Sequence, residues 1–195
     1  MGRFSLKNLN ITAMAVDSSS GGSYIYGATY GDIYMSTDEG KTWKSIKNNL
    51  PSIWKVNCIA IDPENNKTIY LAAFIGLYKS SDGGKNWFKL SKGIENLLGI
   101  DVILIDPHDS KLLFIGTYDN GAFISYDGGA TWQQISNGFY TSRIFSLSVD
   151  PLNNKILYAG TNMGIYKSVN QGKEWKLATL GLPFVLSINS ITIDP

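Results

Sequence analysis

Four carboxylates of this sequence lie outside its evident turns and are placed where they could do chemistry. The sequence has 16 Asp and Glu residues, and all but Asp32, Glu95, Asp101 and Asp119 recur at the turn positions described below. Hydrolysis of a glycosidic bond uses two carboxyl groups about 5–9.5 Å apart, one of them as a general acid. Asp101 with Asp119 or Asp32 is therefore the candidate catalytic set. The alternative, which we favour, is that these are solvated loop charges.

Other reactive side chains are scarce. His108 and Cys58 are the only histidine and cysteine, so the sequence predicts neither a zinc site nor a Cys–His dyad. Cys58 stands where other repeats have small strand residues, which predicts a packing role. His108 follows an Asp-Pro pair in a turn, where a surface position is expected. No glycine-rich phosphate loop occurs, and we expect no cofactor and no metal.

The elements that must position these carboxylates recur four times. An eight-residue box of the pattern S-x-D-x-G-x-T-W begins at Ser36, Ser80, Ser125 and Ser168, at intervals of 43 to 45 residues. A second marker, an aspartate followed in most copies by proline, keeps the same spacing. Its aspartates are Asp17, Asp62, Asp106, Asp150 and Asp194. Two markers in step over the whole chain indicate a tandem repeat.

Each repeat predicts four short antiparallel strands, which we name A to D. Strand A is the apolar run before the marker aspartate, B and C flank a short link, and D begins at the tryptophan of the box. Strand A alternates, as in Met14-Ala15-Val16, and both of its faces are expected to be covered by neighbouring sheets. A single meander of this size buries too little surface to be stable, so the repeats must stack.

Radial stacking of four-stranded sheets makes a β-propeller, and this is the predicted all-β fold. We expect one repeat domain over 1–195 with four four-stranded antiparallel blades. Their approximate ranges are 9–48, 54–92, 98–137 and 142–180, with 187–195 as the first strand of a further blade. In this interpretation the propeller is incomplete or open, and a closed four-bladed ring with an odd strand is the alternative.

The residues of the box have structural explanations. Serine and aspartate side chains bond back to the backbone of a tight turn, glycine tolerates a positive φ, and tryptophan can fill the seam between blades. The fourth copy has asparagine in place of the aspartate. The four boxes consist of Ser36, Asp38, Gly40 and Trp43; Ser80, Asp82, Gly84 and Trp87; Ser125, Asp127, Gly129 and Trp132; and Ser168, Asn170, Gly172 and Trp175.

With these boxes, the chain resembles Asp-box (BNR-type) β-propellers over nearly its whole length. Related families include sialidases, xyloglucan-active glycoside hydrolases, the sortilin N-terminal domain and photosystem II assembly factors. Sialidases need an arginine cluster, whereas Arg3 and Arg143 are the only arginines here. The xyloglucan-active enzymes carry a catalytic base in a link resembling T-D-x-G-G-A-Y. The nearest stretch, Thr117 to Phe123, has an extra tyrosine before Asp119 and lacks one glycine.

Aromatic side chains in the predicted B–C links and D–A loops are candidates for ligand contact. Exposed aromatic faces bury a large area at little entropic cost, so they suit sugars and peptides alike. The other interpretation is that they cap the ends of the blades. The predicted ligand-binding residues are Trp54, Tyr118, Asp32, Tyr30 and Tyr140.

Composition restricts the partners. The net charge of +1, from 17 basic and 16 acidic residues, argues against an extended nucleic-acid surface. No apolar run is long enough to span a membrane. The first residues lack an apolar signal-peptide core, so the compartment stays open: extracellular or periplasmic if a signal peptide has been removed. Self-association through the faces of open end blades is a further expectation.

Two functions follow as hypotheses. The first is a non-catalytic binding or scaffold domain for a protein, peptide or glycan. The second is part of a xyloglucanase-like glycoside hydrolase that uses Asp101 and Asp119. A polysaccharide activity screen with both aspartates replaced would separate them.

Overall fold

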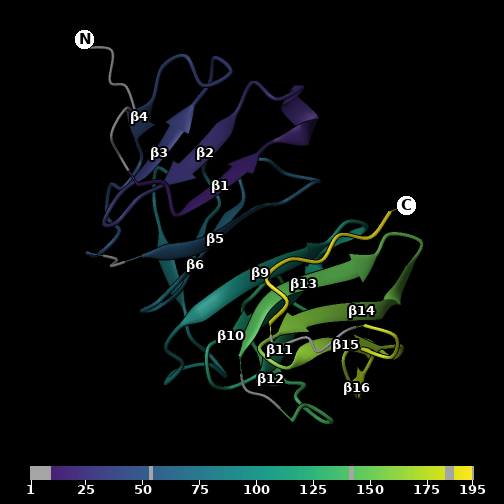
Figure 1. Ribbon diagram of the computed structural model, residues 1–195. Coiled ribbons are helices and arrows are strands. Elements are labelled where there is room, and N and C mark those ends of the chain that lie inside the picture. Colours follow the sequence, from purple (N-terminus) through teal and green to yellow (C-terminus); the bar gives the residue numbers. More distant parts are fainter. Residues whose placement is uncertain (1–9, 53–54, 141–142, 183–186, 195) are drawn as a thin grey trace. The chain divides into compact units, whose positions relative to one another are not determined.

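The computed structural model describes residues 10–52, 55–140, 143–182 and 187–194. These residues form four antiparallel sheets of four strands each (Figure 1). In every sheet the strands are neighbours in the order in which they follow one another along the chain. The predicted all-β fold with four four-stranded antiparallel blades is therefore confirmed. We number the sheets as blades 1 to 4.

The chain divides into two compact units, Met1–Leu90 and Ser91–Pro195, and each holds two blades. Blade 1 consists of β1 (Ala13–Val16), β2 (Ile25–Ala28), β3 (Ile33–Ser36) and β4 (Lys44–Ser45). Blade 2 consists of β5 (Val56–Ile61), β6 (Ile69–Ala73), β7 (Gly76–Ser80) and β8 (Phe88–Leu90).

The second unit holds the longer strands. Blade 3 consists of β9 (Ile100–Asp106), β10 (Asp109–Thr117), β11 (Ala122–Ser125) and β12 (Gln133–Gln134). Blade 4 consists of β13 (Ile144–Asp150), β14 (Asn153–Thr161), β15 (Gly164–Ser168) and β16 (Lys176–Leu177).

The marker aspartates end strand A in different ways. In blade 4, Asp150 pairs directly with Asn153, so a tight hairpin joins β13 to β14 and lengthens both strands. In blade 1, Asp17 instead caps a short 3-10 helix, η1 (Ser18–Ser20), and its side chain accepts a hydrogen bond from the Ser19 N–H. Proline follows the aspartate in blade 4 but not in blade 1.

The core of the first unit lies between its two blades. Blade 1 contributes Tyr26 and Ile33, and blade 2 contributes Ile69, Leu71 and Trp87, all of them buried. All but Trp87, which directly precedes β8, come from the middle strands of each sheet, where β-branched and aromatic residues fit the pleated surface. The stacking predicted from the repeat is thus seen between blades 1 and 2.

The second unit repeats this arrangement between blades 3 and 4. Phe114 and Ile124 of blade 3 pack with Leu147, Tyr166 and Trp175 of blade 4, and all five are buried. Gly116 lies where β10 meets β13, because a Cβ there would come within 2.7 Å of an Ile144 methyl carbon. A residue with any side chain would force the two blades apart at this point.

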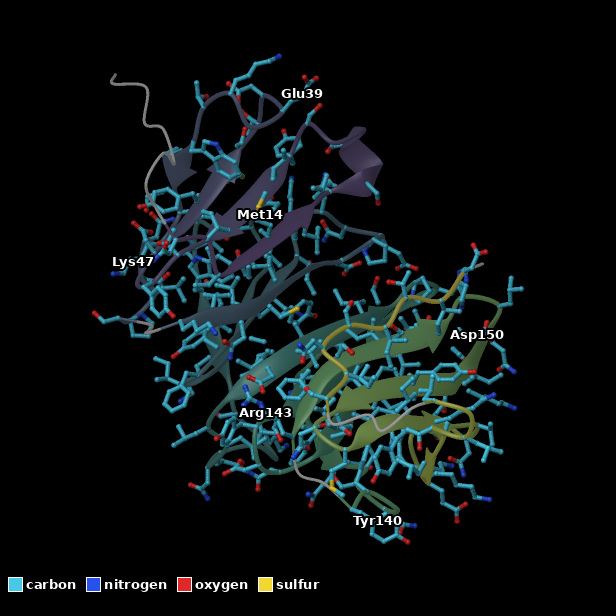
Figure 2. The ribbon with its side chains drawn as sticks, in the orientation of Figure 1. Met14, Glu39, Lys47, Tyr140, Arg143 and Asp150 are labelled. Carbon is cyan, nitrogen blue, oxygen red and sulfur yellow. The ribbon has the colours of Figure 1, made fainter. Side chains whose placement is uncertain are left out.

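Strand A of blade 1 departs from the prediction that both of its faces are covered. The side chains of Met14 and Val16 are 58% and 55% exposed, and Figure 2 labels Met14 on β1. The corresponding Leu147 of blade 4 is buried against blade 3. Coverage of this face needs a sheet on its far side, and the described part of the first unit has none there.

The predicted strand over 188–193 has no ladder partner among the described residues. Residues 187–194 lie beside blade 4, where Ser148 Oγ donates to the Ile191 carbonyl oxygen at 2.7 Å. The Ile188 N–H donates to the Thr161 carbonyl oxygen at 2.8 Å. A strand A pairs with the strand B that follows it, and none follows within these residues.

Candidate functional site

Each blade has two chemically different ends. Since successive strands run in opposite directions, the B–C link and the D–A loop emerge at one end of a sheet. The A–B turn and the box emerge at the other. We call these the link end and the box end of a blade.

The boxes form a hydrogen-bonded turn in all four blades. In the first, Ser36 Oγ donates to Asp38 Oδ1 at 2.8 Å and accepts from the Gly40 N–H at 2.8 Å. Asp38 Oδ1 accepts from the Thr42 N–H, and Oδ2 accepts from Thr42 Oγ1 at 2.6 Å. The serine is buried in every box. Each polar atom of this turn is thus used to hold its backbone.

These bonds also set the protonation of the box aspartates. The hydroxyl of Thr42, together with its backbone N–H, lowers the pKa of Asp38 to about 2. The Asn86 side chain and N–H do the same for Asp82, and those of Thr131 for Asp127. All three carboxylates therefore stay ionised far into the acid range, as hydrogen-bond acceptors of the turn. Such groups are poor candidates for proton transfer near neutral pH.

Two of the box tryptophans join blades. Trp87 Nε1 donates to the Ile46 carbonyl oxygen of blade 1 at 2.9 Å. Trp175 Nε1 donates to the Ile135 carbonyl oxygen of blade 3 at 2.8 Å. Trp43 and Trp132 instead donate to the glycine carbonyl of their own box. The indole therefore bonds to the preceding blade in the two blades, 2 and 4, whose predecessor belongs to the same unit.

A charged and aromatic cluster stands at the link end of the second unit. Arg143 directly precedes β13, and its Nε donates to Asp101 Oδ2 of β9 at 3.1 Å (Figure 2). The guanidinium carbon lies 4.5 Å from the ring centroids of both Tyr118 and Phe145. The Arg143 and Asp101 side chains are 38% and 14% exposed. One arginine therefore ties a carboxylate of blade 3 to an aromatic residue of each blade.

The two predicted catalytic carboxylates have different surroundings. Asp101 is largely covered and paired with Arg143, whereas Asp119 is exposed in the B–C link of blade 3. The side-chain amide of Asn120 donates to Asp119 Oδ1. The link itself is held by Thr117, whose Oγ1 donates to the Gly121 carbonyl oxygen at 2.9 Å.

Of the two predicted ligand residues of blade 1, Asp32 is hydrogen-bonded within the blade and Tyr30 is exposed. Asp32 Oδ1 accepts from the Ile33 N–H at 2.7 Å and from Ser45 Oγ at 2.8 Å, so it fastens strands C and D. Tyr30 is 62% exposed. It lines an open hollow of about 610 Å³ together with Asn10, Ile11, Thr12 and Lys55.

The D–A loop of blade 3 carries two aromatic residues, one packed at the seam between blades and one exposed to solvent. The Phe139 ring lies 4.9 Å from that of Tyr166 and 4.8 Å from that of Trp175, so it caps the seam. Tyr140, the next residue, is 83% exposed (Figure 2). Trp54, the other predicted ligand residue, lies outside the described residues.

The remaining reactive side chains belong to different blades. His108 is exposed in the A–B turn of blade 3, with Nε2 2.8 Å from the Pro151 carbonyl oxygen. Cys58 lies partly buried in β5, opposite Ala72. Within the described ranges, no three His, Cys, Asp or Glu residues gather closely enough to hold a metal ion. Those ranges also contain no helix long and apolar enough to cross a membrane.

Sequence reasoning singled out neither Arg143, which joins two blades, nor Lys55, which lines the hollow of the first unit. Both directly precede a strand A, and in each unit that position faces the B–C link of the preceding blade. A basic residue at this place in the repeat, with a tyrosine in the preceding link, was the signal available.

The geometry of the box agrees with a family model. The model named BNR/Asp-box repeat matches residues 34–45 and 123–134, which contain the first and third boxes. By this model the chain carries Asp-box repeats. No curated protein matches its sequence.

Solved structures share the fold of this chain at low sequence identity. An ancestral GH74 enzyme is 22% identical with a TM-score of 0.76, over 91% of this chain and 24% of that one. A domain described as extracellular, in a hybrid two component system of B. thetaiotaomicron, is 15% identical with a TM-score of 0.68, over 92% and 26%. YCF48 from Cyanidioschyzon merolae is 16% identical with a TM-score of 0.60, over 85% and 55%.

The present chain spans only about a quarter of the first two of these chains and about half of the third. At these identities the likeness shows the β-propeller type of fold, and function has to be argued from the site.

Proposed function

We propose that this chain is a binding or scaffold domain that holds a protein, peptide or glycan at the link ends of its blades and does not cleave it. The observation that carries this proposal is the exposure of aromatic side chains at these ends. Tyr30, Phe74, Tyr118 and Tyr140 are between 45% and 83% exposed. Rigid aromatic faces in contact with water are favourable binding groups, because ordering them costs little entropy.

The surroundings of Asp101 support binding over catalysis. Its Oδ2 already accepts a hydrogen bond from Arg143, and its side chain is only 14% exposed. That arrangement suits a structural ion pair better than proton transfer to a substrate. Asp119 would then lack the second carboxyl group that glycoside hydrolysis requires.

A glycoside hydrolase role is the second candidate. Asp101 and Asp119 both belong to the link end of blade 3, one at the start of β9 and the other in the link that follows β10. The GH74 enzyme shares the fold, and this chain spans about a quarter of it. In this case the segment would supply part of an active site.

One set of assays decides between these functions. Reducing-sugar release from xyloglucan and mixed-linkage β-glucan is measured for the wild type, Asp101→Asn and Asp119→Asn, beside binding to the same polysaccharides and to a peptide array. We expect binding without turnover. Tyr118→Ala or Tyr140→Ala should weaken it roughly tenfold.

Tyr126→Ala is the matched control, since Tyr126 is 49% exposed but belongs to the box of blade 3. It should leave binding unchanged. Turnover by the wild type that disappears in either aspartate variant would show that the chain is catalytic.

A further inference from the structure

The hollow at the link end of the first unit has a counterpart in the second. Lys55 and Arg143 are the residues directly before strand A of blades 2 and 4. Tyr30 and Tyr118 are the equivalent link tyrosines of blades 1 and 3. The third pair is Thr12 and Asp101, each five residues before the marker aspartate of its blade; Thr12 directly precedes β1 and Asp101 is the second residue of β9. The molecule thus contains the same three positions twice.

The two copies differ in charge. In the second unit a carboxylate, Asp101, is built in beside the cation and the tyrosine. In the first unit threonine takes the place of that carboxylate, and the described residues contain no ion pair of Lys55. The second unit therefore shows which group the first unit lacks.

Among the described residues a hollow of about 610 Å³ is present at this position. Tyr30, Lys55, Asn10 and Thr12 line it, and the Thr12 hydroxyl, which donates to the Ala28 carbonyl oxygen at 3.4 Å, keeps its acceptor lone pairs. An arginine sandwiched by two aromatic rings fills the matching place in the second unit. In the first unit Asn57 stands at the position of Phe145, so the repeat supplies no aromatic residue at this one position.

We propose that this hollow binds a sugar residue bearing a carboxylate, of the uronic-acid type, with the carboxylate against Lys55. The ligand carboxylate takes the role that Asp101 has in the second unit, and the sugar ring lies on the exposed face of Tyr30. Charge-assisted hydrogen bonds between an ammonium and a carboxylate are short and roughly twice as strong as neutral ones. The amide of Asn10 and the hydroxyl of Thr12 suit the sugar hydroxyls. The inference rests on the proposed binding role of the link ends and names the ligand class for one of them.

The test compares oligogalacturonate with its fully methyl-esterified form, by calorimetry at 50 mM and 300 mM salt. The esterified ligand keeps the sugar and removes the charge. We expect the wild type to prefer the acidic form about tenfold at low salt and less at high salt. Lys55→Gln should abolish the preference, and Lys55→Arg should retain it.

The most direct variant is Thr12→Asp, which places a carboxylate in the first unit at the position that Asp101 has in the second. This carboxylate should form an ion pair with Lys55, compete with the ligand and weaken oligogalacturonate binding at least tenfold. Thr12→Asn should not have this effect. Lys41→Gln is the charge-matched control, because Lys41 belongs to the first box and pairs with Glu39. Thermal unfolding midpoints confirm that each variant is folded.

The outcomes separate this inference from the proposed function. Equal binding of acidic and esterified ligands, or equal effects of Lys55→Gln and Lys41→Gln, overturns the acidic-sugar site and leaves the binding role standing. Binding of a glutamate-rich peptide but not of oligogalacturonate, with the same Lys55 dependence, overturns the sugar assignment. Absence of binding to every saccharide and peptide removes both proposals.

Discussion

At the scale of single residues, the fourth box differs from the other three in having an asparagine in place of the aspartate. Asp38, Asp82 and Asp127 accept hydrogen bonds through both carboxylate oxygens. Asn170 of the fourth box keeps the bonds of one oxygen, from Ser168 Oγ and from the Glu174 N–H. The turn survives there without a charge. The three aspartates therefore add a proton-linked contribution to stability that the asparagine cannot.

This difference predicts how stability depends on acidity. The folded pKa of each box aspartate is about 2, below the ordinary value of 3.8, so its contribution is complete above about pH 4. It is lost as the pH falls from about 4 through 2, because protonation then favours the unfolded chain. Urea midpoints between pH 5 and 2 should fall less steeply for the triple variant Asp38→Asn, Asp82→Asn, Asp127→Asn than for the wild type.

Glu39→Gln serves as the control, since Glu39 is an exposed carboxylate of the first box. Its profile should follow the wild type. Parallel profiles for the wild type and the triple variant would show that the box carboxylates do not carry this acid sensitivity.

At the scale of elements, the D–A loops hold each blade to the tryptophan of the next. Gly138 has a φ of 93°, and the loop approaches β16 so closely that the Trp175 N–H donates to the Asn137 carbonyl oxygen at 2.9 Å. In blade 1 Asn49 replaces this glycine. Its side-chain amide bonds both the N–H and the carbonyl oxygen of Trp87, at 2.8 and 2.9 Å. Backbone and side chain thus make the same connection in two ways.

Gly138→Ala should break this connection. A Cβ at residue 138 would come within 2.1 Å of the Trp175 carbonyl oxygen. The alanine would also have to adopt a positive φ, which residues with a side chain rarely do. We expect a loss of about 2 kcal/mol or more in the free energy of unfolding, measured by urea denaturation. Gly181 is the matched control: it has a φ of 87° at the same place in blade 4, and no described atom would lie within 4 Å of its Cβ. An equal loss in Gly181→Ala would assign the effect to backbone strain alone.

The period of the sequence predicts the elements well because each strand is marked twice, by its alternating pattern and by the turn that ends it. As the pattern indicates, β5 is the apolar run that ends directly before the marker aspartate Asp62, and β7 and β15 each end at the first serine of a box. The repeat alone does not give the link of Arg143 to Asp101 and Tyr118, since it describes positions within a blade and this cluster joins two; the basic residue before strand A was the only signal of it. Nor could the repeat predict that Phe139 caps a seam while its neighbour Tyr140 faces water. That difference depends on the packing of Tyr166 and Trp175.

At the scale of the whole molecule, acidic and basic side chains nearly cancel. The chain has 17 lysines and arginines against 16 acidic residues. A protein that follows a nucleic-acid backbone neutralises several phosphates and releases their counterions, so its affinity falls steeply with salt. A net charge of +1 does not provide the excess of positive charge that such binding needs. Recognition of an acidic ligand by this chain would depend on single placed cations such as Lys55.

This balance predicts the absence of general polyanion binding. A fluorescent single-stranded oligonucleotide of about 20 nucleotides should show no anisotropy change with micromolar protein at 150 mM salt, because several cations in a row are required for such binding. The oligogalacturonate of the preceding test supplies the positive comparison, since it carries carboxylates on sugar rings that can lie on Tyr30. Micromolar oligonucleotide binding that weakens steeply with salt would mean that the basic side chains act together as one surface. Loss of acidic-sugar binding in Lys55→Gln would then have to be read as a general charge effect.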